Sequence, residues 1–282
     1  MSFDVDERKS CLEELLRVAA SAASVVMKIY GTEFGVDWKG KDDPVTVADR
    51  EANALICDAI GRSFPGVPIV AEESDARTFE GYRTARECFF VDPIDGTREF
   101  IAKNGQFCVM IGLVEGNRST LGILHSPVER TVIAGGDGIA AFRRVAEGDR
   151  EPVRVSDTRS VSASEIVTSR SHAAPHVDAM IARLAPRLRT PWGSSGIKAC
   201  RVATALADVY LHPGKAGKRW DVCAPEAVVR AAGGEMTDVW GEPFDYHAED
   251  LSNFHGMLAT NGHLHASIVE TLRSFREETS GA

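Results

Sequence analysis

Two aspartates in the segment FFVDPIDGTREF, residues 89–100, stand three positions apart where an apolar run ends. Asp92 and Asp95 flank the backbone carbonyl of Ile94, and a glycine and a threonine follow at once. Hard cations such as Mg²⁺ bind carboxylate, carbonyl and water oxygens, and paired ions in phosphate-processing sites lie about 4 Å apart. The segment therefore predicts a site for divalent cations. The alternative is an acidic turn, because Asp-Pro and Asp-Gly dipeptides are common in turns.

Further carboxylates stand at the ends of other predicted elements. Asp49 and Asp221 come at helix starts, and Glu72 and Glu73 follow a strand-like run. Taken singly, each has an ordinary explanation, since aspartates are good helix N-caps and a pair of glutamates can end a strand in solvent. Four such coincidences, together with a turn rich in oxygen ligands, favour a different interpretation. We predict that these acids, far apart in the sequence, meet in one pocket and hold metal ions.

The spacing of the acids argues against other acidic signatures. Phosphatases of the haloacid dehalogenase type need Asp-x-Asp-x-Thr, with the first aspartate as nucleophile, and nucleotide-sugar transferases often carry Asp-x-Asp. The two acids here are three positions apart, and a proline lies between them. A calcium-binding EF-hand needs a run of closely spaced oxygen ligands in one loop, which this segment does not offer.

Composition narrows the function classes. The chain of 282 residues carries a formal net charge of −9 and has no basic run, which disfavours a nucleic-acid-binding surface. No apolar stretch is long enough to span a bilayer, and the charged N-terminus MSFDVDERKS does not resemble a secretory signal. The six cysteines are scattered without a CxxC pair, which is typical of free, buried thiols. These features predict a cytoplasmic protein without membrane or nucleic-acid partners, either a monomer or a homodimer.

Periodic apolar residues indicate alternating helices and strands, and therefore stacked α and β layers. Helices are predicted over residues 7–30, 49–62, 176–186, 194–207, 221–234 and 263–276. Strands are predicted within residues 67–74, 87–96, 106–116, 119–127, 130–136, 165–172 and 207–213. The run over 106–136 has the turns of an antiparallel meander, a polar loop is expected over 38–49, and a seam between two halves is expected near 155–162.

With these segments in order, the chain resembles the Mg²⁺-dependent, lithium-sensitive phosphatases of the inositol monophosphatase superfamily. The likeness rests on the motifs DPVTVAD (43–49), VAEES (70–74), VDPIDGT (91–97) and WDVCAPEAVVRAAGG (220–234). The resemblance implies an α/β (α+β) fold, a five-layer αβαβα sandwich of the inositol monophosphatase and fructose-1,6-bisphosphatase type. It also implies an N-terminal half, residues 1–157, with most of the metal ligands, and a C-terminal half, residues 158–282, with substrate-binding residues and Asp221.

Carried over position by position, the resemblance implies a centre of two or three Mg²⁺ ions. The implied metal ligands are Glu72, Asp92, the carbonyl of Ile94, Asp95 and Asp221. Asp49 and Thr97 are implied to position and deprotonate a water that attacks the phosphate in line, so no phosphoenzyme is expected. Glu73 matches a neighbouring acid of the family, which is expected to support the metal ligands without itself binding the metal.

Several segments are similar to those of 3'(2'),5'-bisphosphate nucleotidases, which remove the 3'-phosphate of 3'-phosphoadenosine 5'-phosphate to give AMP and phosphate. The segments are DPIDGTREFIAKNGQFCVMIGL (92–113), TSRSH (168–172), GSSGIKAC (193–200) and KRWDVCAPE (218–226). The candidate substrate-binding residues are Gly96, Thr97, Ser169, His172, Ser195, Lys198 and Asp221. Ser194 and Ser195 are expected to open a helix, whose N-terminus favours an anion.

Alternatives stay open at this point. Lys198 is also explained as a solvated helix lysine, and His172 as an ordinary loop histidine. The substrate, a small-molecule phosphate monoester, could instead be an inositol or sugar monophosphate, because the same superfamily includes such phosphatases. A further alternative is a non-catalytic nucleotide-binding protein on the same fold.

Overall fold

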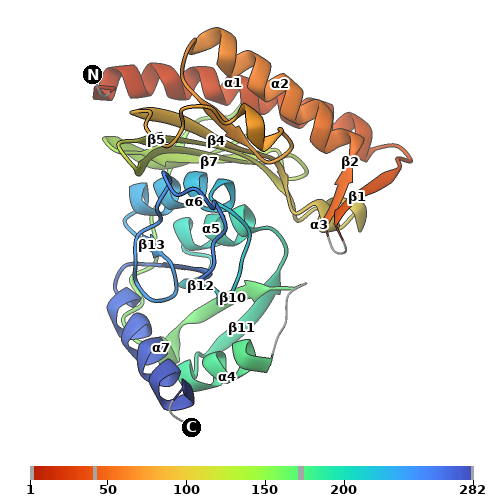
Figure 1. The fold of residues 1–282 in the computed structure, drawn as a ribbon. Helices are drawn as coiled ribbons and strands as arrows, with labels where there is room; N and C mark the ends of the chain where they lie inside the picture. Colours follow the sequence, from red (N-terminus) through yellow and green to blue (C-terminus); the bar gives the residue numbers. More distant parts are fainter. Residues whose placement is uncertain (1–2, 41–42, 171–174, 281–282) are drawn as a thin grey trace.

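The structure is a computed structural model that describes residues 3–40, 43–170 and 175–280. Its helices and sheets form five layers, with helices α1 and α2 outermost at one end and α4 and α7 at the other (Figure 1). A seven-stranded sheet and a five-stranded sheet enclose the middle layer of α5 and α6. The predicted α/β fold with this layer order is confirmed. The bounds of these helices are α1 (Val5–Tyr30), α2 (Val47–Ser63), α4 (Pro175–Leu184), α5 (Ser195–Ala203), α6 (Trp220–Ala231) and α7 (His265–Ser280).

The seven-stranded sheet follows chain order from β3 to β9. Strands β4 to β9 pair antiparallel with their neighbours, so the predicted meander is confirmed, and β3 pairs parallel with β4. The parallel pair brings the chain ends after β3 and β4 to one edge of the sheet. The strands are β3 (Ile69–Ala71), β4 (Glu87–Asp95), β5 (Cys108–Glu115), β6 (Arg118–Ser126), β7 (Thr131–Gly136), β8 (Ile139–Val145) and β9 (Glu151–Pro152).

The five-stranded sheet has the order β11-β10-β12-β14-β13. Strand β10 is parallel to β11 and β12, whereas β14 is antiparallel to β12 and β13. The chain crosses from the first sheet to the second between Pro152 and Glu165, and the predicted division at residues 157 and 158 falls within this connection. The strands are β10 (Glu165–Ser169), β11 (Leu188–Trp192), β12 (Val209–His212), β13 (Glu235–Thr237) and β14 (Met257–Thr260).

Helix α6 packs unusually close to the seven-stranded sheet because glycines face it. A Cβ on Gly122 of β6 would lie 2.2 Å from the carbonyl oxygen of Ala224, and one on Gly112 of β5 would lie 2.4 Å from the Sγ of Cys223. Only glycine allows this approach of helix backbone to strand backbone. The first half of α6 thereby packs directly on this sheet, and Asp221 in its first turn lies close to Asp92 and Asp95 of β4.

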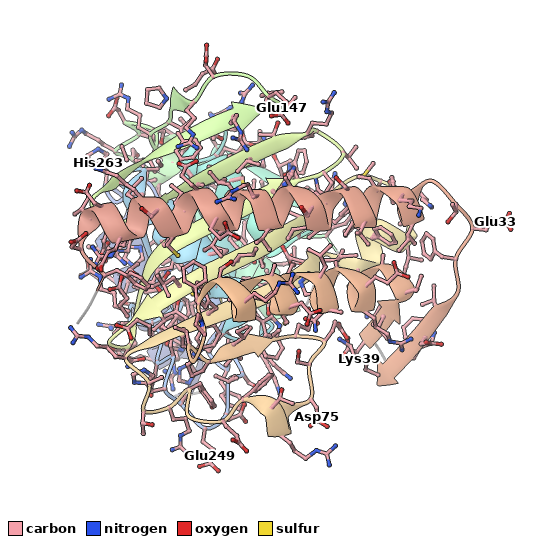
Figure 2. All side chains as sticks on the ribbon, turned by 90° about the horizontal axis from the view of Figure 1, so that it is seen from above. Glu33, Lys39, Asp75, Glu147, Glu249 and His263 are labelled. Atoms are coloured by element: carbon pink, nitrogen blue, oxygen red, sulfur yellow. The ribbon has the colours of Figure 1, made fainter. Side chains whose placement is uncertain are left out.

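The polar loop expected over residues 38–49 is wrong at every described position, because residues 38–40 and 43–46 lie in strands and residues 47–49 lie in α2. Residues there form an antiparallel hairpin of β1 (Val36–Gly40) and β2 (Asp43–Thr46). Four of the five residues of β1 are exposed, so no apolar alternation marks the strand in the sequence. Figure 2 shows Lys39 of this hairpin beside the N-terminal end of α2.

Helix α2 begins two residues earlier than predicted. Its N-cap is Thr46, and Asp49 occupies the third helical position, where its carboxylate accepts a hydrogen bond from the Thr46 N–H at 2.8 Å. The interpretation of Asp49 as an N-cap is therefore wrong, because the two residues form a reciprocal capping box. Over the described residues, no helix is both long and apolar enough to cross a membrane.

Candidate active site

Three carboxylates from strand β4 and helix α6 meet in the described part of the chain. Ligand atoms of Asp92, Asp95 and Asp221 all lie within 4.8 Å of one another. Residues three apart in a regular strand point to opposite faces, but the pairing of β4 with β5 is irregular between Asp92 and Asp95. The irregularity explains how both side chains reach one cluster. The Ile94 N–H donates to Asp92 Oδ1 at 3.0 Å and fixes this turn.

Asp221 enters the cluster from the first turn of α6. The N-cap position belongs to Arg219, so the interpretation of Asp221 as an N-cap is wrong. Its Oδ2 instead accepts the backbone N–H of Lys218 at 2.7 Å. A carboxylate in the first turn is also favoured by the positive end of the helix dipole.

Glu72 approaches the cluster from the end of β3. Its N–H donates to the Val91 carbonyl at 3.0 Å, which continues the parallel pairing of β3 with β4 by one residue. The ammonium of Lys39 lies 3.2 Å from Glu72 Oε1, 2.6 Å from Glu73 Oε1 and 3.5 Å from Asp43 Oδ1. Sequence reasoning missed Lys39, because its hairpin was taken for a loop.

The environment of Glu72, Asp92 and Asp221 disfavours their ionisation in the absence of a cation. Burial raises the pKa of Glu72 to about 7, although Lys39 opposes the shift. Burial raises the pKa values of Asp92 and Asp221 well above the ordinary range, and the carboxylates around each add to its rise. Hard oxygen donors, a buried setting and excess negative charge together fit a divalent cation such as Mg²⁺. These residues could hold a metal ion.

The hydroxyl of Thr97 links Asp49 to the turn after β4. Thr97 Oγ1 lies 3.0 Å from Asp49 Oδ1 and 3.2 Å from the carbonyl oxygen of Ile94. The other oxygen, Asp49 Oδ2, accepts from both the N–H and the hydroxyl of Thr46, at 2.8 and 2.6 Å. Asp49 is only 1% exposed, and its burial raises its pKa. The arrangement directs one carboxylate oxygen at the threonine hydroxyl.

A cavity of about 250 Å³ adjoins the acids. Gly96, on the cavity wall, adopts φ 96°, and a Cβ there would lie 3.0 Å from the Gln106 carbonyl oxygen, so the turn requires glycine. His172 lies outside the described residues. Candidates from the sequence that line the cavity are Asp95, Gly96, Thr97, Ser169, Ser195, Lys198 and Asp221. Lining residues that sequence reasoning missed include Asp43, Arg98, Glu99, Tyr210 and His212.

Lys198 is buried in the cavity wall, with 3% of its surface exposed. The interpretation as a solvated helix lysine is therefore wrong. Its Nζ donates to the Ser194 carbonyl at 2.6 Å and lies 4.9 Å from the centre of the Tyr210 ring. Burial lowers the pKa of Lys198 to about 8, and the nearby carboxylates of Asp95 and Glu99 oppose this. The side chain places a cationic group in the same cavity wall as the acids.

Helix α5 opens where the sequence predicted, but its first turn already has an acidic partner. The side chain of Ser194 caps the helix, accepting from Ile197 N at 3.0 Å. The Gly196 N–H donates to Asp95 Oδ2 at 2.7 Å, and the Ser194 hydroxyl donates to the same oxygen. The Ser195 hydroxyl donates to the Asp221 carbonyl at 3.2 Å. The helix start therefore fixes the acids of the cluster.

Known proteins share this arrangement of elements. The chain is 34% identical over 237 residues to 3'(2'),5'-bisphosphate nucleotidase CysQ of Escherichia coli (strain K12), and the match covers 83% of this chain and 93% of that protein. The crystal structure of CysQ from Bacteroides thetaiotaomicron matches with a TM-score of 0.75 at 29% identity, covering 90% of this chain and 97% of the other. The Thermotoga maritima IMPase matches with a TM-score of 0.79 at 26% identity, covering 95% and 99%. The pattern of the inositol monophosphatase family matches residues 7–277. The chain is thus a phosphatase that belongs to the inositol monophosphatase family.

Proposed function

We propose that the protein is a Mg²⁺-dependent 3'(2'),5'-bisphosphate nucleotidase that converts 3'-phosphoadenosine 5'-phosphate to AMP and phosphate. The observation that carries the proposal is that one cavity is lined by both carboxylates and a buried ammonium. Asp95 and Asp221 line it, next to Asp92, and Lys198 lies in the same wall with Ser169 and Ser195. A substrate with two phosphates has one group for the proposed metal centre and one for the ammonium. The likeness to CysQ supports the same assignment.

In this proposal Glu72, Asp92, Asp95, Asp221 and the carbonyl of Ile94 hold the metal. Two or three bound Mg²⁺ ions would neutralise phosphate charge and lower the pKa of an attacking water. The nucleophile in this scheme is water, so no cysteine or serine has to attack the phosphate. Preorganised charge neutralisation is the main source of rate in phosphoryl transfer.

Thr97 and Asp49 then orient the attacking water and accept its proton. The Thr97 hydroxyl has one hydrogen and two acceptors in reach, Asp49 Oδ1 at 3.0 Å and the Ile94 carbonyl at 3.2 Å. When Thr97 donates to Asp49, its oxygen lone pairs can accept a hydrogen bond from water. Because burial raises the pKa of Asp49, this carboxylate is a better proton acceptor than an exposed aspartate.

The test is a phosphate-release panel with and without Mg²⁺. We expect kcat/KM for 3'-phosphoadenosine 5'-phosphate to exceed that for inositol 1-phosphate by at least about 100-fold, as expected where a substrate group fills a buried polar site. Equal or reversed values would favour the second candidate, an inositol monophosphatase, which the match to the Thermotoga maritima IMPase supports.

Lithium is expected to inhibit. The six free cysteines support a cytoplasmic location.

A further inference from the structure

A short segment of the chain, residues 251–253, runs beside the loop that leads into α6. The Arg219 N–H donates to the Leu251 carbonyl at 2.9 Å, and Lys218 forms an isolated antiparallel bridge with Ser252. Asn253, the last residue of this segment, is 2% exposed. We propose that Asn253 is a positioning residue that orients the backbone donor to Asp221 and so sets the affinity of the cluster for Mg²⁺. The inference rests on the proposed role of Asp221 as a metal ligand.

Three consecutive carbonyl groups point at Asn253. Its Nδ2 lies 3.1 Å from the Ala216 carbonyl oxygen and 2.6 Å from that of Lys218. Its backbone N–H donates to the Gly217 carbonyl at 3.0 Å, and its own carbonyl accepts from Ala216 N at 3.0 Å. One residue therefore uses its amide side chain and its backbone to fix every peptide plane between Ala216 and Arg219.

The clamp has a direct consequence for Asp221. A trans peptide is planar, and its N–H points away from its carbonyl. The Gly217 carbonyl accepts the backbone N–H of Asn253, so the N–H of the same peptide, which belongs to Lys218, is turned toward Asp221 Oδ2, 2.7 Å away. The Asn253 side chain holds the two flanking peptides through the carbonyls of Ala216 and Lys218 and so restrains this central peptide, and this is the part of the clamp that a substitution removes. The contact is close, since Gly217 adopts φ 62° and a Cβ there would lie 2.4 Å from this oxygen. The clamp thus restricts rotation of the Asp221 carboxylate.

The orientation of the Asn253 amide is itself fixed. The Arg219 guanidinium donates through Nη1 to Asn253 Oδ1 and through Nε to the Asp245 carbonyl at 2.9 Å. Because Oδ1 accepts from the Arg219 guanidinium, the amide must turn its NH₂ group to the loop carbonyls. Groups that orient a metal ligand without touching the metal typically affect metal affinity by about 10–100-fold when removed.

The experiment compares Asn253→Ala with a matched variant, Asn261→Ala, in the full chain without substrate. Asn261 is 1% exposed and also binds through Nδ2, to Ser156 Oγ at 3.0 Å and the Thr158 carbonyl at 2.8 Å. Both variants are expected to lower the thermal midpoint, because both leave buried partners unpaired. Titration calorimetry should show Mg²⁺ binding about 10-fold weaker in Asn253→Ala and unchanged in Asn261→Ala. In a separate assay with substrate, excess Mg²⁺ should restore kcat in Asn253→Ala.

Asn253→Ser decides the question if the alanine variant does not fold. Its hydroxyl can donate to one loop carbonyl, so its affinity for Mg²⁺ should lie between those of the wild type and Asn253→Ala. If Asn253→Ala does not fold, the affinity of Asn253→Ser should still be below that of the wild type. Wild-type affinity in the folded Asn253 variants would overturn the positioning role alone. A wild-type protein that binds no Mg²⁺ would overturn the proposed metal centre, and this inference with it.

Discussion

Replacing Glu72 with glutamine is expected to stabilise the metal-free protein at basic pH while weakening its response to Mg²⁺. Burial raises the pKa of Glu72 from 4.5 to about 7 in the folded chain. The folded state therefore binds this proton more tightly than the unfolded chain. The associated stability is fully present below about pH 4.5 and is lost as the pH rises through about 7.

The size of the effect follows from the same shift. Each tenfold change in proton affinity corresponds to about 1.4 kcal/mol, so a rise from 4.5 to about 7 bounds the effect near 3 kcal/mol. The Glu72 side chain keeps 23% of its surface exposed, and Lys39 lies 3.2 Å away, so solvent and relaxation reduce the gain. We expect about 1–2 kcal/mol, or a rise of about 2–8 °C in the thermal midpoint.

The assay is thermal unfolding in a chelator at about pH 5 and about pH 8, and then in saturating Mg²⁺. Glu72→Gln should have the higher midpoint at basic pH, a similar one at acidic pH, and a smaller rise with Mg²⁺. Glu80→Gln, at an exposed position on the same loop, should match the wild type throughout. A metal-free Glu72→Gln protein less stable than the wild type at basic pH would refute the reasoning, since the ion pair with Lys39 would then outweigh the cost of burial.

Three further changes test other parts of the site. Asp92→Asn should reduce kcat below detection while circular dichroism stays native, because it removes one proposed ligand but keeps the shape of a side chain that is 1% exposed; normal turnover would contradict its assignment. Thr97→Val should lower kcat by about 100-fold, the low end for proton-transfer groups, with Thr97→Ser close to wild type in the same steady-state assay. Lys198→Met should raise KM for a bisphosphate by about 10-fold, equivalent to 1.4 kcal/mol, more than for a monophosphate. In the wild type this KM should rise as the pH passes about 8, where the depressed pKa of Lys198 lets it lose its charge; a flat pH profile would argue against the role.

The acidic residues could be found from the sequence because each stands at an end of a strand or helix with a recognisable pattern. The apolar run before Asp92 and the helical periodicity after Asp221 mark those ends directly. The meander was equally clear, since turn residues separate apolar strands over 106–136. Strands β8, β9, β11, β13 and β14 were not predicted. In β8, β9 and β11 most side chains are exposed or half-buried, so no apolar run marks them. Strands β13 and β14 are three and four residues long, and threonine is the only β-branched or aromatic residue in each.

Residues that act through tertiary contacts left no such mark. Lys39 lies on an exposed hairpin, and its sequence neighbours WKGKDD look like a loop. Its importance comes from Glu72 and Glu73, which follow a different strand. Asn253 stands in a polar stretch, DLSNFHG, and its three carbonyl partners belong to the distant loop before α6. Neither pairing has a local period or spacing from which it could be read.

The start of α5 shows how such a contact changes the chemistry that a sequence pattern predicts. A helix N-terminus with two serines is expected to bind an anion, and it does, but the anion is the carboxylate of Asp95. Donation from Gly196 stabilises negative charge on a proposed metal ligand, so the helix strengthens the acidic end of the cavity. The same N–H cannot then bind a substrate phosphate. In the proposed function, a second phosphate therefore needs another partner, and Lys198, one turn along the same helix and buried in the cavity wall, is our candidate. On this proposal, the residues that serve the metal and those that serve the substrate lie within a single turn of α5.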